Sequence, residues 1–288
     1  MYMLAAFLDI VCRARLPRPA ACPPNRRGVG TLILTLLCFS LLSSSALAQT
    51  LRIAAAADLQ FVLPDLAAQY EKQTGVKLAI TYGSSGNFVA QIQNGAPFDL
   101  FLSADTGYPH RLIAAGQADA DSYFVYAIGC LSIWLSPESP LDLAAEGYRT
   151  LLDPRIKQIA IANPEHAPYG RAAVIALHEA TIYDQVKSKL VFGENASQAA
   201  QFVQSGSADA AIIPRSLALS PPMKTGKRYD LTDMRFSLFE QAAVVVKSSP
   251  NKAAAKEFLS FLHSEAGRKI FKNYGVIVPP EFPAGLVR

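Results

Sequence analysis

The chain has 288 residues, of which 51% are hydrophobic and 17% are charged. This composition supports a packed core of one large or two medium domains and excludes an intrinsically disordered chain. The net charge of +4 arises in the first 48 residues, which hold five arginines and one aspartate, and the remainder carries 22 basic and 22 acidic side chains. A neutral body has no basic surface for nucleic acid and no charge pattern for binding a membrane surface.

Residues 1–48 have the features of an export signal. Arg26 and Arg27 precede an apolar run at 31–42, and Ala46-Leu47-Ala48 fits the small-x-small pattern of a cleavage site. The run is shorter than the about 20 residues that span a bilayer. The sequence therefore predicts a signal peptide cleaved after Ala48, with a retained anchor as the alternative. Cys130 is then the one cysteine left, so we expect no internal disulfide and a buried thiol.

Strands and helices alternate after the signal. Three apolar segments are predicted strands, each followed by residues at helical spacing: 51–57, 76–81 and 99–102. The first helix should stop at Thr74-Gly75, and Pro64 should kink it or restart it one turn in. Asp58 falls at the first strand-to-helix turn, in the N-cap position, and Gly83-Ser84-Ser85-Gly86 forms the second turn.

The pattern then restarts in a second series. Five further apolar segments are predicted strands: 130–135, 159–162, 190–192, 210–213 and 241–246. Helices should follow the turns at 168–170 and 195–197, and the C-terminal part should be helical and end near Gly275. This rhythm predicts an α/β protein with a mostly parallel sheet covered on both faces. We expect two lobes: 49–128 plus 243–288, and 129–242.

The strand-to-helix turns also suggest a function. Each helix begins with N–H groups that lack a partner within the helix and lie at the positive end of the helix dipole. Ligands of open α/β sheets bind outside the carboxyl ends of the strands, so four such turns could converge on one cleft between the lobes. A neutral protein could hold a dianion there with N–H groups and serine hydroxyls alone.

At this point the region 49–280 resembles the periplasmic molybdate-binding proteins of ABC transporters. Five segments carry the resemblance: 54–59, 83–85, 95–105, 163–170 and 271–275. The resemblance implies a type II periplasmic binding protein fold, with a mixed sheet flanked by helices in each lobe. It implies capture of molybdate or tungstate between the lobes and delivery to a membrane permease. We accordingly expect a periplasmic monomer that has no cofactor and contains metal only as the bound oxyanion.

The resemblance also assigns the oxyanion-binding residues. Ser85 matches a binding serine, with Ser84 beside it, and Tyr169 and Ala196 match positions whose backbone N–H groups bind from the other lobe. Two positions depart from the family, which commonly has serine at Asp58 and tyrosine at Pro214.

Asp58 leaves two interpretations open, because a carboxylate would repel molybdate, a dianion without a proton. Either Asp58 caps its own helix and offers only backbone N–H groups, which we favour, or it accepts a hydrogen bond from a protonated ligand such as phosphate or a phosphonate. The five candidate binding residues are Asp58, Ser84, Ser85, Tyr169 and Ala196.

An enzyme is the rival class, and the sequence argues against it. Gly83-Ser84-Ser85-Gly86 is not the G-x-S-x-G turn that activates a nucleophilic serine. The four histidines are scattered without metal-ligand spacing: His110, His166, His178 and His263. His166 is in a loop, where a lone histidine is typically a surface residue. Asn195, Ser197 and Asp105 are predicted to cap helices or turns.

Overall fold

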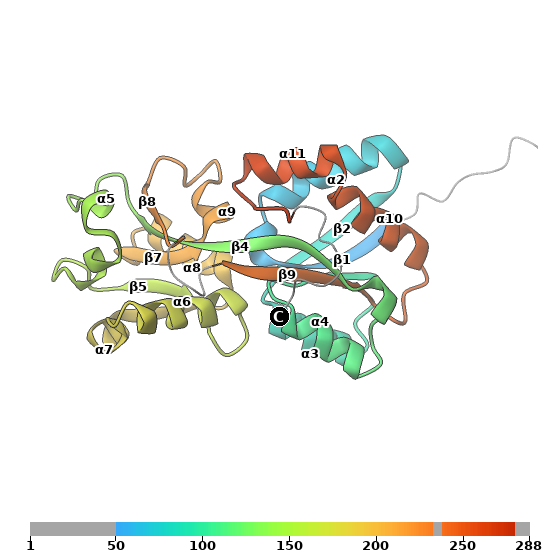
Figure 1. Ribbon diagram of the computed structural model, residues 1–288, viewed down its shortest axis with the longest axis horizontal. Coiled ribbons are helices and arrows are strands. Elements are labelled where there is room, and N and C mark those ends of the chain that lie inside the picture. Colours follow the sequence, from blue (N-terminus) through green and yellow to red (C-terminus); the bar gives the residue numbers. More distant parts are fainter. Residues whose placement is uncertain (1–49, 233–237, 280–288) are drawn as a thin grey trace, which may run out of the picture. The chain divides into compact units, whose positions relative to one another are not determined.

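The computed structural model describes residues 50–232 and 238–279, which belong to one compact unit, Ala48–Arg288 (Figure 1). The predicted signal peptide, 1–48, and its cleavage after Ala48 lie outside the described residues. Within these two described ranges, no helix is long and apolar enough to cross a membrane.

The first group of strands contains three parallel strands and one antiparallel strand. β1 (Thr50–Ala56) pairs in parallel with β2 (Lys77–Gly83) and with β3 (Leu100–Leu102), and β9 (Leu238–Val245) runs antiparallel to β3. Every residue of β3 and the last five of β9 are buried, which explains why both segments are apolar, except at Gln241, rather than alternating.

The second group repeats this arrangement. β5 (Ile159–Ala162) pairs in parallel with β6 (Leu190–Gly193) and with β7 (Ala210–Pro214). β8 (Lys227–Asp230), a short strand that the sequence pattern did not predict, runs antiparallel to the end of β4 (Phe124–Leu135).

β4 connects the two groups. Its first half pairs with β9 from Phe124 to Cys130, and its second half pairs with β7 from Leu131 to Leu135. The nine strands of the described residues therefore follow the order β2-β1-β3-β9-β4-β7-β5-β6, with β8 on β4. The sequence predicted only the second half of this strand, from Cys130 onward. The lobe boundaries, 49–128 plus 243–288 and 129–242, stay a prediction.

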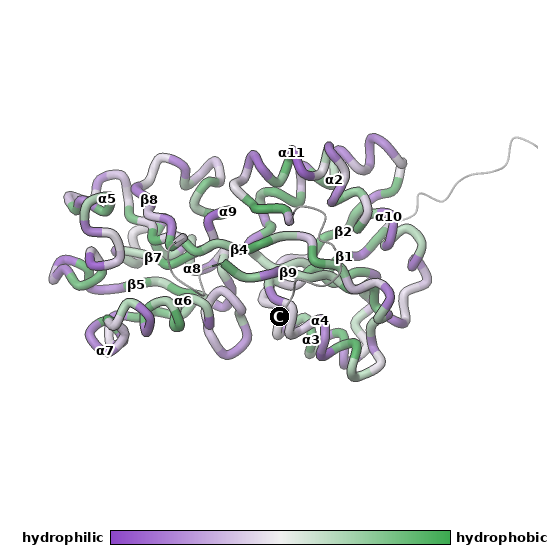
Figure 2. Tube along the Cα trace, in the orientation of Figure 1, coloured by the Kyte–Doolittle hydropathy of each residue, from purple (hydrophilic) through white to green (hydrophobic). Residues whose placement is uncertain are grey.

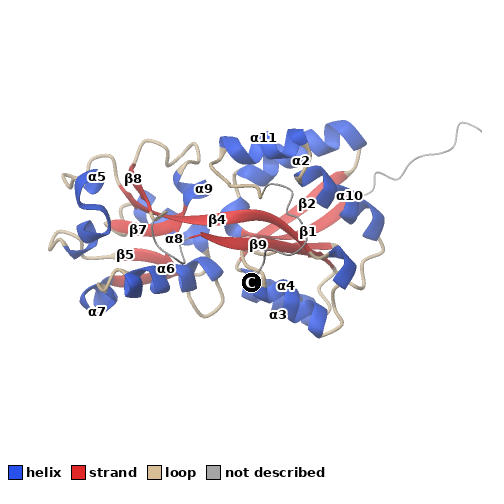
Figure 3. Cartoon of the chain, in the orientation of Figure 1, coloured by secondary structure: helices blue, strands red, loops and turns tan. Residues whose placement is uncertain are grey.

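Helices cover both faces of the strands (Figure 3). The main helices of the described residues are α2 (Val62–Thr74), α3 (Ser85–Gln93), α4 (Gly107–Ala114), α6 (Pro168–Glu179), α8 (Ala196–Gln204), α10 (Lys252–Leu262) and α11 (Glu265–Asn273). Single turns also occur, among them η1 (Ala57–Leu59), α5 (Leu143–Glu146), α7 (Tyr183–Val186) and α9 (Arg215–Ala218). Figure 1 shows α2, α10 and α11 together on one face of the first strand group, opposite α3 and α4.

Three apolar clusters form the core, and the strands are its most hydrophobic part (Figure 2). One cluster packs α2, α10 and α11 on the first strand group, and a smaller one lies under α3 and α4. The largest cluster surrounds β5 and β7. Cys130 is 4% exposed and free, as predicted, and burial raises the pKa of its thiol.

The helix boundaries follow the local signals. α2 ends at Thr74, where Gly75 adopts the left-handed conformation with φ of 75°, which glycine enters without strain. Pro64 is the third residue of α2, so its missing N–H removes no intrahelical hydrogen bond. The predicted restart of this helix is confirmed.

Phe258 provides a test of the core around α10. Its side chain is fully buried, and its ring meets that of Tyr70 edge-on at a centroid distance of 5.1 Å. Phe258→Ala should lower the free energy of unfolding by about 3–5 kcal/mol, because it removes apolar contacts and leaves a cavity. Urea unfolding measures the change. Phe192→Ala is the matched control, since Phe192 is 52% exposed and should cost under about 1 kcal/mol.

Candidate functional site

A small hollow lies where several strand-to-helix turns meet. It holds about 200 Å³ of space not filled by protein atoms, whereas four other hollows on the described surface hold about 600 to 790 Å³ each. Its lining residues are Ala56, Ala57, Asp58, Gly83, Ser84, Ser85, Ala104, Ala167, Pro168, Tyr169 and Ala196. All five predicted binding residues are among them.

Helix N-termini supply much of this lining. Ser85 is the first residue of α3, Tyr169 the second of α6, and Ala196 the first of α8. The backbone N–H groups at these positions have no acceptor within their own helices, and the helix dipoles add partial positive charge. None of the lining residues is a lysine or an arginine. Positive potential in the hollow therefore comes from backbone dipoles.

The two serines of the α3 turn keep their hydroxyls free of capping. Ser84 is the N-cap residue of α3, yet its side chain makes no cap hydrogen bond. Its Oγ lies 2.9 Å from Nδ1 of His166. Ser85 Oγ accepts a hydrogen bond of 3.0 Å from the N–H of Ala104, so its own proton remains available to a ligand. Both hydroxyls are buried, and that of Ser85 keeps its proton for a ligand.

Asp58 is not a helix cap, which corrects the favoured interpretation of the sequence. It lies inside the single turn η1, and α2 begins only at Val62, so neither helix is capped by its carboxylate. The side chain is buried, with Asp58 3% exposed, and its Oδ2 accepts a hydrogen bond of 2.7 Å from Nε2 of Gln241. Its Oδ1 is buried without a hydrogen-bond partner.

Burial is the main cause of the raised pKa values of Asp58, Tyr126 and Tyr169. It raises the pKa of Asp58 from 3.8 to about 6, and the hydrogen bonds from Gln241 and then Tyr169 oppose the rise. Burial, followed by the charge of Asp58, raises the pKa of Tyr169 well above its ordinary value. The same two causes act on Tyr126, whose hydroxyl donates to the carbonyl of Ser103 over 2.9 Å. Both phenols therefore stay protonated.

Gln241 joins Asp58 to Tyr169. Its Nε2 also donates to Tyr169 Oη over 3.0 Å, and an amide nitrogen has two hydrogens to give. The Tyr169 ring packs edge-on against Phe239 at 4.9 Å. Gly129 permits this packing, because a Cβ atom there would lie 2.8 Å from Tyr169 Oη. The hydrogen bonds of Gln241 thus join β9 to η1, through Asp58, and to α6, through Tyr169.

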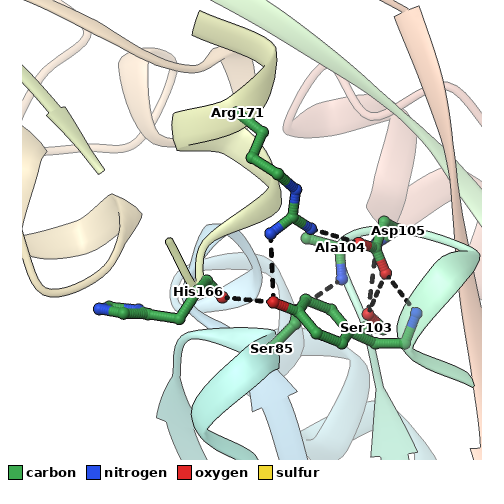
Figure 4. A network of polar contacts seen from close by, with 7 residues as sticks. Ser85, Ser103, Ala104, Asp105, His166 and Arg171 are labelled. Atoms are coloured by element: carbon green, nitrogen blue, oxygen red, sulfur yellow. Dashed lines mark hydrogen bonds and ion pairs between the residues drawn. The ribbon is translucent and has the colours of Figure 1, made fainter. Parts of the chain in front are cut away.

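A second polar network joins α6 to the turn before α4 (Figure 4). Arg171 donates to Oδ2 of Asp105 over 2.7 Å and to Tyr108 Oη over 3.1 Å, and its guanidinium lies over the Tyr108 ring. Tyr108 Oη in turn donates to the carbonyl of His166. Asp105 also caps its own turn, as predicted, by accepting from Tyr108 N–H and Ser103 Oγ.

Further hydrogen bonds join the turns around the hollow. Gly86 N–H donates to the His166 carbonyl over 2.9 Å. Ser197 Oγ donates to the Ala57 carbonyl over 2.9 Å, and Ser216 Oγ to the Asp58 carbonyl over 2.8 Å. Gly86 has no room for a side chain, because a Cβ atom would lie 2.8 Å from the His166 carbonyl oxygen.

Several residues of the site escaped the sequence analysis. His166, interpreted as a surface residue, has a side chain that is only 20% exposed and contacts Ser84. Gln241 had one signal, since it is polar within an otherwise apolar strand. Asn195 does cap α8, as predicted, by accepting from Gln198 N–H. Pro214 ends β7 and is the N-cap residue of α9.

The described part of the chain contains no group of three or more histidine, cysteine, aspartate or glutamate side chains that could hold a metal ion. What the hollow offers is a set of hydrogen-bond donors of fixed direction, together with one carboxyl group. Such an arrangement can bind a small anion.

The raised pKa of Asp58 predicts a specific pH dependence of stability. Between about pH 4 and pH 6 the folded protein holds a proton that the unfolded chain has released, so this group favours folding more as the pH falls. Relative to Asp58→Asn, the ligand-free wild-type protein should gain about 1 kcal/mol of unfolding free energy between pH 7 and pH 5. Urea unfolding of both proteins at the two pH values measures this gain, and a gain in the opposite direction would contradict the buried carboxyl described above.

The chain is similar to known binding proteins along most of its length. A family model described as bacterial extracellular solute-binding protein matches residues 51–277. A molybdate-binding protein, ModA, of Azotobacter vinelandii is 35% identical over 240 residues, which cover 82% of this chain and 92% of that protein. The Rhodobacter capsulatus protein of that name is 32% identical over 224 residues, covering 78% and 86%.

The fold agrees with these relatives. The solved periplasmic molybdate-binding protein of Azotobacter vinelandii superposes with a TM-score of 0.74 at 33% identity, covering 80% of this chain and 100% of that one. The predicted type II periplasmic binding protein fold is confirmed. The chain belongs to the bacterial extracellular solute-binding proteins, as a homologue of those that bind molybdate.

Proposed function

We propose that this protein captures molybdate or tungstate in the hollow and delivers it to the membrane permease of an ABC importer. The observation that carries the proposal is the convergence of Asp58, Ser84, Ser85, Tyr169 and Ala196 on one small hollow lined by helix N-termini. Relatives at 32–35% identity are molybdate-binding proteins, which supports this ligand over phosphate or a phosphonate.

The hollow would bind the ion through donors from both halves of the chain. Ser85 would donate its hydroxyl proton, which the hydrogen bond from Ala104 leaves free, and Ser84 would donate beside it. The N–H groups of Tyr169 and Ala196 would donate from α6 and α8. Fixed backbone donors cost little to reorganise, and they reject a cation of the same size. Tungstate has nearly the same size and charge as molybdate, so we expect it to bind as well.

Capture would proceed by closure of two lobes, 49–128 plus 243–288 on 129–242. The contacts that join these segments would be made on closure: Arg171 to Asp105, Ser197 to the Ala57 carbonyl and Gly86 to the His166 carbonyl. Closure removes water from the ion and strengthens its hydrogen bonds. The permease would then recognise the closed form.

The relatives also support a proposal about where the protein acts. We propose that the chain is exported by the segment 1–48, which is cleaved after Ala48, and that it acts in the periplasm as a monomer without a cofactor. Its relatives are transport proteins, and we propose no enzymatic activity for it.

Thermal unfolding with single oxyanions tests the ligand. The purified protein would be heated with millimolar molybdate, tungstate, sulfate, phosphate or a simple phosphonate. An ion at about 100 times its dissociation constant adds about 2.7 kcal/mol of stability, or about 5–10 °C in a protein of this size. We expect this shift with molybdate and tungstate alone. A shift only with phosphate or the phosphonate would favour the protonated ligand, and no shift with any ion would refute oxyanion binding.

Ser85 provides the matching test of the site. Ser85→Ala removes one hydrogen bond to a charged ligand, so its dissociation constant for molybdate in calorimetry should rise about 10- to 100-fold. Ser260→Ala is the control, because the hydroxyl of Ser260 is exposed on α10 and donates only to the Lys256 carbonyl. An unchanged affinity in a folded Ser85→Ala protein would remove Ser85 from the site.

A further inference from the structure

The carboxyl group of Asp58 creates a conflict inside the hollow. Its Oδ2 is occupied by Gln241, and its Oδ1 is buried without a hydrogen-bond partner, although Asp58 lines the space proposed for the ion. The ionised oxygen can only accept hydrogen bonds, and so can every oxygen of molybdate. Two acceptors that share a buried site without a proton between them repel each other.

Among the described residues, no lysine or arginine pairs with Asp58 to resolve this conflict, and His166 contacts Ser84 rather than Asp58. η1 packs against β2, α8 and α9, and the Asp58 side chain meets α6, β4 and β9. These elements carry the following titratable or charged groups: Lys77, Tyr82, Tyr126, Cys130, Tyr169, Arg171, His178, Glu179, Arg215 and Glu240.

The groups that meet Asp58 most closely, Tyr126 and Tyr169, are neutral phenols. The two arginines are turned to other acceptors, since Arg171 binds Asp105 and Arg215 binds the Gly275 carbonyl. Lys77 begins β2, whereas the hollow lies at the other end of that strand, at Gly83. The charge of Asp58 therefore has no counter-ion among these side chains.

We propose that the oxyanion binds together with one proton from solvent, which resides on Oδ1 of Asp58 in the complex. Oδ2 keeps its hydrogen bond from Gln241, and the protonated Oδ1 donates to an oxygen of the ion. No covalent bond of the ligand is made or broken, and the buffer supplies the proton. Asp58 thereby becomes one more donor in a hollow built of donors. This inference rests on the proposed function.

Burial raises the pKa of Asp58 to about 6, which brings the titration of this carboxyl close to neutral pH. A bound dianion would raise it further, because a negative charge nearby favours the neutral acid. Affinity should then fall about tenfold for each pH unit above 7, since each unit makes the proton ten times scarcer. Capture would thus be stronger in mildly acidic surroundings.

Calorimetry counts the proton directly. Molybdate would be titrated into the wild-type protein at pH 8 in two buffers of different ionisation enthalpy, which gives the number of protons taken up per ion. We expect about one proton for the wild type and none for Asp58→Asn, whose amide imitates the protonated acid. The dissociation constant of the variant should stay constant from pH 7 to pH 9, while that of the wild type rises about 100-fold.

Two more variants complete the design. Asp121→Asn is the matched control, because Asp121 is exposed on the turn 120–122 and should leave the proton count at one. Asp58→Ser, a smaller neutral replacement, should also bind without proton uptake, and it covers the case in which Asp58→Asn fails to fold.

The outcomes separate this inference from the proposed function. Binding by the wild type without proton uptake would overturn the inference and leave the function intact. Proton uptake that persists in Asp58→Asn would overturn it too, because the proton would then reside elsewhere. Loss of molybdate binding in folded Asp58→Asn and Asp58→Ser proteins would show that the ionised carboxylate is needed. Absence of binding by the wild type at every pH would refute the function itself.

Discussion

The pairing of β4 with β9 is the constraint on which the site depends. β4 pairs with β9 along its first half and with β7 along its second, so a single strand belongs to both strand groups. The parallel strands of each group then end near the same region, and the turns that follow β1, β2 and β5 supply lining residues of one hollow. β9 also carries Gln241, which binds Asp58 from the middle of this arrangement. A site built this way requires both groups at once.

The hollow offers hydrogen-bond donors to an anion although no lysine or arginine lines it. A lysine or arginine would bind any anion, whereas fixed N–H groups select for size and for the absence of protons on the ligand. Ser85 illustrates the principle, because the hydrogen bond that it accepts from Ala104 leaves its proton pointing elsewhere. Asp58 departs from the principle as long as it is ionised. Its burial and its unpaired Oδ1 make its negative charge energetically unfavourable.

Much of the fold could be predicted from the sequence, because apolar periodicity and glycine stops are local signals. The strand-to-helix turns carrying Ser85, Tyr169 and Ala196 were found in this way. The role of Asp58 as a cap was wrong, because Asp58 lies inside the separate turn η1 and α2 begins only at Val62. His166 could not be placed either, because its contact with Ser84 joins residues 82 positions apart. Such contacts depend on the antiparallel pairing of β4 with β9, which the periodicity of the sequence alone does not reveal.

Hydrogen bonds couple the hollow to the contacts that join its two sides. Ser85 is hydrogen-bonded to Ala104, and the next residue, Asp105, binds Arg171 on α6. Tyr169 is the second residue of α6, so the two ends of this chain of contacts both reach the hollow. A shift of the turn at 103–105 would therefore move Ser85, the proposed oxyanion donor, together with Asp105, the acceptor of the ion pair. In the proposed complex, the ion and the Arg171–Asp105 pair would therefore stabilise the same arrangement of α3, α4 and α6.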